Sequence, residues 1–331
     1  MRLYHALTPK QRWRETPQDI QAFNLAFGDG VKLYAAMSQD PSYLAAVEAP
    51  DMKLYYATMV QDKGQFPALA QLKPSVLLSY HYYGKYDLDE LLCKHFSAPV
   101  DVFLDSGAFS AHTLGAEIKE PDYVAFIKRY QHRLGCYAVL DDTRSPENTW
   151  DAQRRMEDAG VNPLPVWHVR EPLSWLERYL DAGYKRIAVG GMVPFLARPK
   201  VLMPKLAQAH LLARGRAGLH GFGATSWTVA QQVPWDSVDS SSWTGCVRFG
   251  QLDLFDRRLA KFQKLKLGDR AAWHRCARQL AELGAAPEPF GSWPRGQTLK
   301  GPDRIALLAL SARSYAAAAA HAGRMHGKGN S

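Results

Sequence analysis

Residues 186–223 read RIAVGGMVPFLARPKVLMPKLAQAHLLARGRAGLHGFG, and this stretch decides the expected fold. It holds a short run rich in β-branched residues, RIAVGG, then a helical segment, KVLMPKLAQAHLLARG, then a second short run, GLHGFG. Two parallel strands need a crossover connection, which is usually a helix and is right-handed. The stretch therefore predicts one βαβ unit of a parallel sheet.

The same alternation recurs along the chain from Lys53 onward. Eight short runs predict strands: KLYYAT, SVLLSY, VDVFLD, YAVLD, LPVWH, RIAVGG, GLHGFG and DSVD. Most segments between them open on Ser, Pro, Asp or Glu, and several close on Gly, as helices do. Eight such units predict an α/β fold, a (β/α)8 TIM barrel over residues 51–256. An open doubly wound sheet is the alternative, and it is less favoured because the first junction lacks a GxGxxG turn.

Two regions flank the predicted barrel. In residues 1–50, Thr16 and Pro17 carry the signature of a helix start, which predicts an N-terminal helical extension. Residues 257–331 predict a basic helical C-terminal region that ends in an alanine-rich helix. The chain is thus expected to have three parts.

The composition is typical of a folded protein. A chain of 331 residues with 47% hydrophobic residues can bury a large core. The N-terminus lacks the apolar run of a signal sequence, and no stretch of about 18 apolar residues occurs, so we expect a cytoplasmic protein with no membrane partner. The four cysteines, Cys93, Cys136, Cys246 and Cys276, form no CxxC pair, so neither a zinc knuckle nor a disulfide framework is indicated.

The net charge of +9 is concentrated near the C-terminus. Residues 248–331 hold 15 Lys and Arg against 6 Asp and Glu, whereas the acids and bases of the remaining chain cancel. A neutral body with a basic C-terminal region suits a polyanionic partner, because cations that neutralise phosphates release counterions. A solvated helical face is the alternative interpretation of these charges.

Polar residues follow the predicted strands at their carboxyl ends, where a barrel of this type builds its site. They are Asp105, Ser106, Asp141, Asp142, His168, His220 and Asp239, with Gly190, Gly191 and Met192 after the sixth strand. Asp142 comes just before the helix that starts at Ser145, so we assign it a capping role. The other acids and the two histidines are expected to converge on one rim.

The residue types at this rim favour acid chemistry without a metal. No HExxH motif occurs and the first strand carries no HxH, so no metal site is expected. A carboxylate attacks a sugar carbon without prior deprotonation, while a second carboxyl group protonates the leaving group. Asp239, in WDSVDSSSW, is the candidate nucleophile, with the hydroxyls of Ser240 and Ser241 keeping it ionised. The alternative is an acid that caps a turn in a serine-rich loop.

Six motifs occur in order between Lys53 and Trp243: DSGAF, LDD, PVWH, IAVGGMV, HGFG and SVDSSSW. As an ordered set they resemble the queuine/archaeosine tRNA-guanine transglycosylases. Within that superfamily the chain looks most like the phage and bacterial DpdA-type DNA transglycosylases, which insert 7-deazaguanines into DNA. The resemblance implies a (β/α)8 barrel that exchanges guanine through a covalent intermediate. It implies neither cofactor nor metal in the reaction, and a location in the bacterial cytoplasm or a phage-infected host cell.

The resemblance also implies roles for single residues. Asp239 matches the nucleophile that attacks C1′, and Asp105 matches the acid that helps to expel guanine and later deprotonates the incoming base. Asp141 matches the carboxylate that reads the guanine edge, and His168 stands where the tRNA enzymes commonly carry a base-contacting Gln. The other positions matched to base binding are Ser106, Gly190, Gly191, Met192, His220 and Phe109, the last as an aromatic that stacks on the base.

One departure from the family concerns zinc. The tRNA enzymes carry a CxCxxC plus His zinc site after the nucleophile strand, where this chain has only Cys246 and Cys276. The basic region in this place favours guanine-containing DNA over tRNA, with a free 7-deazaguanine base as the second partner. The residues expected to contact phosphates are Arg257, Arg258, Lys261 and Lys264. The alternatives are a tRNA-guanine transglycosylase, a non-catalytic nucleic-acid-binding barrel, and a hydrolase that releases guanine without replacing it.

Overall fold

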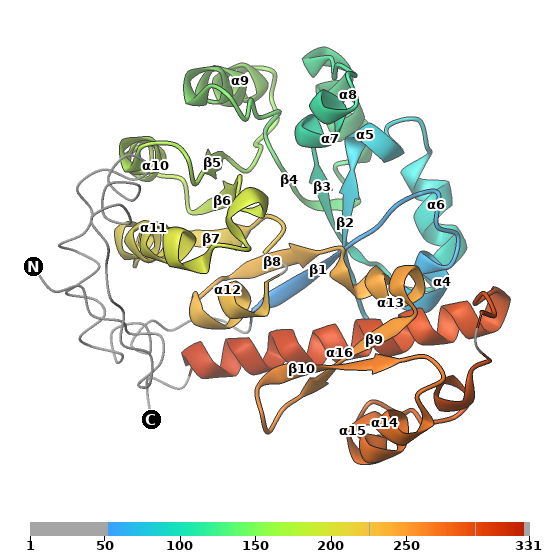
Figure 1. Ribbon diagram of the computed structural model, residues 1–331. Coiled ribbons are helices and arrows are strands. Elements are labelled where there is room, and N and C mark those ends of the chain that lie inside the picture. The colour runs from blue at the N-terminus through green and yellow to red at the C-terminus, as the bar shows by residue number, and fades with distance from the viewer. Residues whose placement is uncertain (1–51, 225, 295, 328–331) are drawn as a thin grey trace, which may run out of the picture.

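The computed structural model describes residues 52–224, 226–294 and 296–327 (Figure 1). Eight parallel strands form one sheet in the order β4-β3-β2-β1-β8-β7-β6-β5. The strands are β1 (Lys53–Ala57), β2 (Ser75–Ser79), β3 (Asp101–Asp105), β4 (Leu134–Tyr137), β5 (Val166–His168), β6 (Arg186–Gly190), β7 (Gly218–Gly221) and β8 (Ser237–Ser240). The predicted N-terminal extension, residues 1–50, lies outside the described residues.

Helices connect the strands and surround the sheet (Figure 1). Those between β1 and β8 are α4 (Gln65–Leu69), α5 (Tyr80–Tyr83), α6 (Leu88–His95), α7 (Ala108–Thr113), α8 (Glu120–Tyr130), α9 (Pro146–Asp158), α10 (Leu173–Asp181), α11 (Pro199–Ala213) and α12 (Trp227–Gln232), with the 3-10 turn η1 (Val193–Phe195). The predicted start signals are confirmed at α9, where Ser145 Oγ accepts a hydrogen bond from the backbone N–H of Asn148 at 3.1 Å and Pro146 is the first helical residue.

The sheet is strongly curled. The ring of Phe103 on β3 lies 4.7 Å from the ring of His220 on β7, although three strands separate β3 from β7 in the sheet order. Neighbouring strands are about 4.8 Å apart, so a flat sheet would hold these two strands much further from each other. The side chains of β3 and β7 therefore meet inside the curve of the sheet.

The ends of the sheet order are β4 and β5, which share no strand ladder. Just beyond β4, Ala138 forms a parallel bridge with Leu164, and the N–H of Val139 donates to the Leu164 carbonyl at 3.0 Å. The architecture is an α/β fold with a curled, half-barrel sheet, consistent with a TIM-like barrel in which β4 and β5 are joined by a bridge rather than a full ladder. The predicted parallel βαβ arrangement is confirmed, but the fourth strand, predicted at residues 137–141, is Leu134–Tyr137 and shares only Tyr137 with the prediction.

The C-terminal region differs from the prediction. Residues from 257 onward were expected to be helical, but β9 (Gln251–Asp256) and β10 (Lys261–Lys266) form an antiparallel hairpin. Leu252 and Leu254 are fully buried two residues apart on β9, the spacing of a half-buried strand. This period-two pattern outweighs the charges that suggested a solvated helix. Further elements are η2 (Ser242–Thr244), α13 (Gly245–Phe249), α14 (Arg270–Arg275), α15 (Ala277–Glu282), η3 (Phe290–Ser292) and α16 (Gly301–Gly327).

The long helix α16 belongs to the layer of helices around the sheet and is not a separate appendage. It crosses the molecule beside β1 and packs against α4, α12 and β9 (Figure 1). The buried hydroxyl of Tyr56 on β1 donates to the Ala312 carbonyl of α16 at 2.8 Å. The small, buried alanines of α16 let this helix approach β1 closely. The β9–β10 hairpin therefore lies outside the ring of helices. None of the described helices is long and apolar enough to cross a bilayer.

Candidate active site at the carboxyl ends of the strands

Three acids from different strands lie near one another at the rim. Asp105 is the last residue of β3, Asp239 lies in β8, and Asp141 follows β4. The charges of both Asp141 and Asp239 act on Asp105 strongly enough to shift its pKa. The curl of the sheet thus brings together the three carboxylates that the sequence placed at strand ends.

Asp105 is a carboxyl group held in its acid form at neutral pH. Burial raises its pKa to about 8, and the neighbouring charges of Asp141 and Asp239 act in the same direction. The backbone N–H of Gly107, which donates to Asp105 Oδ2 at 3.2 Å, offsets only part of this effect. A carboxyl group with this pKa can both release and accept a proton near neutral pH.

The turn after Asp105 needs glycine. Gly107 has a φ of +76°, and a Cβ there would clash with the hydroxyl of Ser79 and with His81. Ser79 is paired with Asp105 in the β2–β3 register, and its buried Oγ has no hydrogen-bond partner within the described residues. An unpartnered buried hydroxyl beside the acid with the raised pKa is unusual in a folded protein, and no role was predicted for Ser79 from the sequence.

Asp141 is fixed by two donors. Ser106 Oγ donates to Asp141 Oδ1 at 3.1 Å, and His168 Nε2 donates to Asp141 Oδ2 at 2.9 Å. On its other side, His168 Nδ1 donates to Glu171 Oε1 at 2.7 Å. The result is a chain of carboxylate, imidazole and carboxylate in which His168 and Glu171 are buried and Asp141 is 13% exposed.

His168 is an imidazolium in this arrangement. Burial alone lowers its pKa, but the hydrogen bonds and charges of Asp141 and Glu171 outweigh burial and raise the pKa to about 10. Glu171 also accepts a hydrogen bond from the backbone N–H of His168 at 3.1 Å, so one carboxylate fixes both ring and backbone. Glu171 was not predicted as a site residue from the sequence. The signal that could have predicted it is an acid three residues after a histidine at a strand end.

Gly190 and Gly191 make room for the His168 ring. Gly190 is the register partner of His168, and a Cβ at Gly190 would lie 2.8 Å from His168 Cδ2. Gly191 has a φ of +70°, and a Cβ there would lie 3.3 Å from His168 Cβ. These two glycines, matched by resemblance to a turn along the base, therefore also have a packing role that the sequence analysis did not foresee.

Asp239 has one bound and one unbound oxygen. Its Oδ1 accepts a hydrogen bond from the backbone N–H of Gly223 at 2.8 Å, and His220 Nε2 lies 3.5 Å from the same oxygen. No hydrogen bond to Oδ2 is formed by the residues that the structure describes. The expected contact from Ser240 is not formed, because Ser240 Oγ instead accepts from the backbone N–H of Ser242 at 3.1 Å.

His220 is a neutral base beneath Asp239. Burial lowers the pKa of His220, although Asp239 acts in the opposite direction. Its Nδ1 is 2.9 Å from Ser237 Oγ, and its ring packs among Tyr55, Phe103 and Phe222. His220 was expected near the face of a bound base; in this structure the residue is 2% exposed and its ring packs among these aromatic side chains.

Three other predicted positions have different outcomes. Met192 is fully buried in the core, so its side chain does not face a ligand in this structure. Phe109, in the first turn of α7, is 62% exposed and is available for stacking. Asp142 has the structural role assigned to it: its carboxylate accepts hydrogen bonds from the Arg144 backbone N–H and from the Asn148 amide, which fixes the turn before α9.

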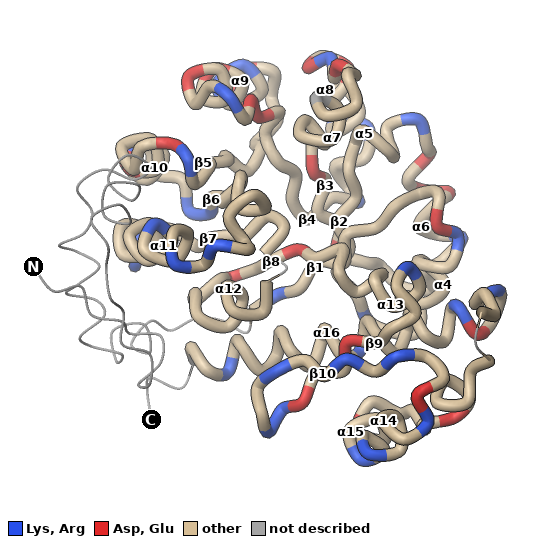
Figure 2. The backbone as a smooth tube through the Cα atoms, viewed as in Figure 1, with Lys and Arg blue, Asp and Glu red and all other residues tan. Residues whose placement is uncertain are grey.

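The four cations predicted to contact phosphates lie away from this rim. They are Arg257, Arg258, Lys261 and Lys264, all exposed in the β9–β10 hairpin (Figure 2). Helix α16 packs against both β1 and β9 and so lies between the hairpin and the sheet (Figure 1). The structure therefore does not bring these cations together with the three carboxylates.

No protein-family model matches the chain, and a search of curated proteins finds no match. Within the described ranges, no three His, Cys, Asp or Glu side chains are arranged to hold a metal ion. All four cysteines are free, with Cys246 and Cys276 buried and Cys93 exposed. The geometry of the rim is thus the observation on which a functional proposal rests.

Proposed function

We propose that this chain is a DNA-guanine transglycosylase, a pentosyltransferase that exchanges guanine in DNA for a 7-deazaguanine base such as 7-cyano-7-deazaguanine. The reaction passes through an ester between Asp239 and the deoxyribose. The support is the combination of six ordered motifs with a rim that holds three carboxyl groups, one of which, Asp105, has a raised pKa. The target guanine must leave the base stack to reach this rim, at a cost of a few kcal/mol.

In the first half-reaction, Asp239 Oδ2 attacks C1′ of the target nucleotide. Oδ1 accepts the Gly223 N–H, whereas Oδ2 accepts no hydrogen bond from the described residues and is the oxygen assigned to the attack. The bond between C1′ and N9 breaks, and its electron pair leaves with guanine. Asp105, protonated because of its raised pKa, gives its proton to the departing base.

In the second half-reaction, the Asp105 carboxylate takes the N9 proton of the incoming 7-deazaguanine. The freed N9 electron pair attacks C1′, and the bond between C1′ and Asp239 breaks. Atoms and charge balance over the two halves, because one N-glycosidic bond replaces another and Asp105 regains its proton. Asp141, held by Ser106 and His168, presents its remaining lone pairs to the N–H groups of the guanine edge.

The observation that carries this proposal is the meeting of Asp105, Asp141 and Asp239 at one rim, at the carboxyl ends of different strands. An acid raised to about 8 by burial and by two neighbouring carboxylates suits a group that must act as acid and base in turn. Carboxyl groups that served only the fold would gain nothing from lying so close together, since burying a charge without a full set of partners destabilises a protein.

Mass spectrometry of the denatured protein tests the proposal. The full chain is incubated with guanine-containing DNA, denatured, and digested, and an adduct of one DNA strand on the peptide containing Asp239 is expected. Base exchange is measured in parallel with labelled guanine. Asp239→Asn should abolish the adduct and lower exchange by at least about 1,000-fold, because the amide is a poor nucleophile.

The matched control is Asp142→Asn, which makes the same change in the turn beside the rim and should leave the adduct unchanged. An adduct and exchange with tRNA but not with DNA would identify the tRNA enzyme instead. Abasic DNA formed without any added base would identify a hydrolase. Binding of DNA without adduct or exchange would leave a non-catalytic binding protein and overturn the proposal.

A further inference from the structure

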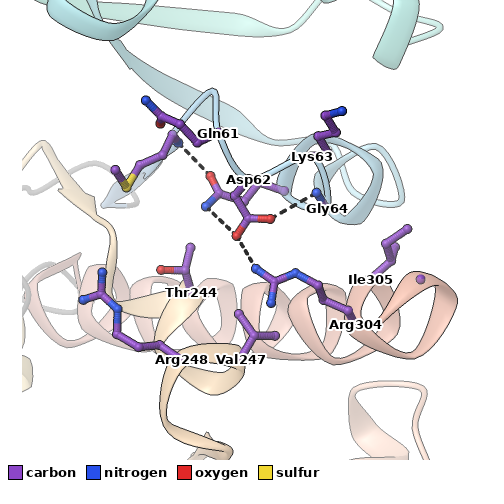
Figure 3. Close-up of a pocket in the computed structure, with 12 residues that line it drawn as sticks. Gln61, Asp62, Lys63, Gly64, Thr244, Val247, Arg248, Arg304 and Ile305 are labelled. Atoms are coloured by element: carbon purple, nitrogen blue, oxygen red, sulfur yellow. Dashed lines mark hydrogen bonds and ion pairs between the residues drawn. The ribbon is translucent and has the colours of Figure 1, made fainter. Parts of the chain in front are cut away.

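A cavity of about 650 Å³ lies between the loop after β1 and helices α13 and α16 (Figure 3), and its lining includes none of Asp105, Asp141 and Asp239. One wall is the loop that follows β1, with Met59, Lys63 and Gly64. The other wall is formed by α13, which contributes Arg248, and by the first turns of α16, which contribute Arg304. This volume is within the range of sites that bind small molecules or nucleotide-sized groups.

The cavity has an excess of positive charge. Its lining holds three cations, Lys63, Arg248 and Arg304, and one acid, Asp62. Asp62 is already neutralised, because Arg304 donates to its Oδ2 at 2.5 Å and the backbone N–H of Gly64 donates to its Oδ1 at 3.1 Å. In the described part of the chain neither Lys63 nor Arg248 forms an ion pair, which leaves two cations for an anionic ligand.

The cavity is close to the proposed nucleophile along the chain and in the sheet. Asp239 is the register partner of Tyr55, and Met59 follows Tyr55 by four residues at the carboxyl end of β1. From Asp239 itself, Thr244 in the cavity wall is only five residues further on. The indole N–H of Trp243 donates to the Ala57 carbonyl at 3.1 Å and ties these two chain segments together.

An exposed aromatic side chain stands next to the cations. Phe249, the last residue of α13, is 72% exposed, and the Arg248 guanidinium lies 5.9 Å from its ring centroid. Met59, which lines the cavity, is 42% exposed. Proteins that follow a single strand of nucleic acid combine cations for the phosphates with exposed aromatic side chains on which bases stack. Both parts occur here within two adjacent residues.

We propose that this cavity is a subsite for the DNA strand next to the target nucleotide: Lys63 and Arg248 bind a phosphate, and Phe249 stacks on an unpaired base. The choice of DNA rests on the proposed function, whereas the subsite itself rests on the cavity, its charge and the exposed ring. The subsite holds the strand while its neighbouring nucleotide is turned into the rim. The hairpin cations that the sequence suggested are not needed for this contact.

Fluorescence anisotropy with a 15-nucleotide single-stranded DNA tests the subsite in the full chain. The double variant Lys63→Ala/Arg248→Ala should raise Kd about tenfold near physiological salt, because a phosphate contact is lost. The slope of log Kd against log salt should become shallower by about 0.7 for that lost contact. Phe249→Ala should raise Kd about tenfold as well, with an unchanged salt slope, because it removes stacking and no charge.

The matched controls remove the same charge or a similar exposed apolar surface elsewhere. Lys128→Ala/Lys185→Ala removes two exposed lysines, one in the last turn of α8 and one just before β6, at the opposite end of the strands. Leu259→Ala removes a 56% exposed side chain in the β9–β10 turn. Equal Kd values and salt slopes for the subsite variants and these controls would overturn the subsite.

Two further ligands test which kind of molecule binds in the cavity. Free dGMP is expected to compete only weakly, and competition as strong as that of the 15-mer would show a nucleotide pocket instead of a strand subsite. Tighter binding of an RNA 15-mer than of the DNA 15-mer, with the same dependence on Lys63 and Arg248, would overturn the assignment to DNA.

The failure of the subsite and the failure of the proposed function give different results. If base exchange proceeds and the KM for DNA is unchanged in Lys63→Ala/Arg248→Ala, the subsite is wrong and the function stands. If the wild-type chain shows no exchange but DNA affinity depends on these residues as expected, the function is wrong and the subsite stands.

Discussion

The rim has two sides, and each contains a buried histidine next to a carboxylate. On the side of β3 to β5, His168 contacts Asp141, and on the side of β7 and β8, His220 faces Asp239. Both rings are almost fully buried and both lie at the carboxyl ends of strands. Yet the pKa of His168 is raised to about 10, whereas the pKa of His220 is lowered.

The difference comes from the number of close carboxylates. His168 has two, at 2.9 and 2.7 Å, and their attraction outweighs the cost of burying a charge. His220 has one at 3.5 Å and three aromatic neighbours, so burial dominates. Burial alone therefore does not decide the protonation state of a histidine; the hydrogen-bonded charges around it do.

This contrast fits the roles proposed for the two sides. A permanent imidazolium at His168 fixes the Asp141 carboxylate, which is suited to reading a ligand. A neutral His220 leaves the charge of Asp239 uncompensated, which suits a nucleophile, because a cation in contact with Asp239 would lower its reactivity. A histidine beside an aspartate thus fixes the carboxylate of Asp141 on one side of the rim and leaves that of Asp239 free on the other.

The largest expected effect comes from removing each histidine in turn. His168→Phe leaves Asp141 and Glu171 as buried carboxylates without their shared cation, and it should lower the free energy of unfolding by about 3–5 kcal/mol. His220→Phe places one more ring among aromatic neighbours and leaves only the Ser237 hydroxyl unpaired, so it should cost about 1–2 kcal/mol. Urea denaturation at pH 7 measures both. Equal losses would contradict the difference between the two sides.

A smaller effect is expected from pH. A histidine with a raised folded pKa stabilises the fold fully below its unfolded pKa of 6.5, and this stabilisation is lost as the pH rises through about 10. The stability difference between wild type and His168→Phe should therefore shrink by about 3 kcal/mol between pH 7 and pH 10.

Nuclear magnetic resonance of labelled histidine rings reports the same states directly. The His168 ring should show imidazolium shifts at pH 8.5, whereas the His220 ring should be neutral at that pH and should titrate below the usual pH range of a histidine. A His168 ring that is neutral at pH 8.5 would show that the two carboxylates do not hold the proton. Assignment through the two Phe variants identifies the signals.

The sequence predicts the sheet better than the details of the site. Seven of the eight strands were placed well because they are short apolar runs bounded by Gly or polar residues, whereas the fourth, β4, has no fully buried residue and was predicted three residues too late. The β9–β10 hairpin was missed because the three lysines of KFQKLK give β10 a basic composition, which was interpreted as a solvated helical face.

The site residues also fall into two groups: those at strand ends, which the sequence predicts, and those that depend on packing, which it does not. Asp105, Asp141 and Asp239 were found because a parallel sheet places the ends of its strands together. The direction of His220, the burial of Met192 and the partner Glu171 depend on how turns and rings pack, which the spacing of residues does not show. The cavity near Arg248 combines segments separated by about 180 residues, so no local pattern predicts it.

The smallest expected effect separates two acids at neighbouring strand ends. Because the folded pKa of Asp105 is raised from 3.8 to about 8, its protonated form stabilises the fold fully below pH 3.8, and this contribution is lost as the pH rises through about 8. Asp105→Asn keeps a neutral side chain at every pH, so its stability relative to wild type should be higher at pH 9 than at pH 5. For Asp142, burial alone would raise the pKa, but hydrogen bonds from Asn148 and Arg144 hold it below its usual range. Asp142→Asn should therefore destabilise the protein at pH 9. The midpoints of urea unfolding measure both variants. Midpoints that move in the same direction for both would show that burying Asp105 has no cost and that Asp105 is not poised as the acid of the proposed reaction.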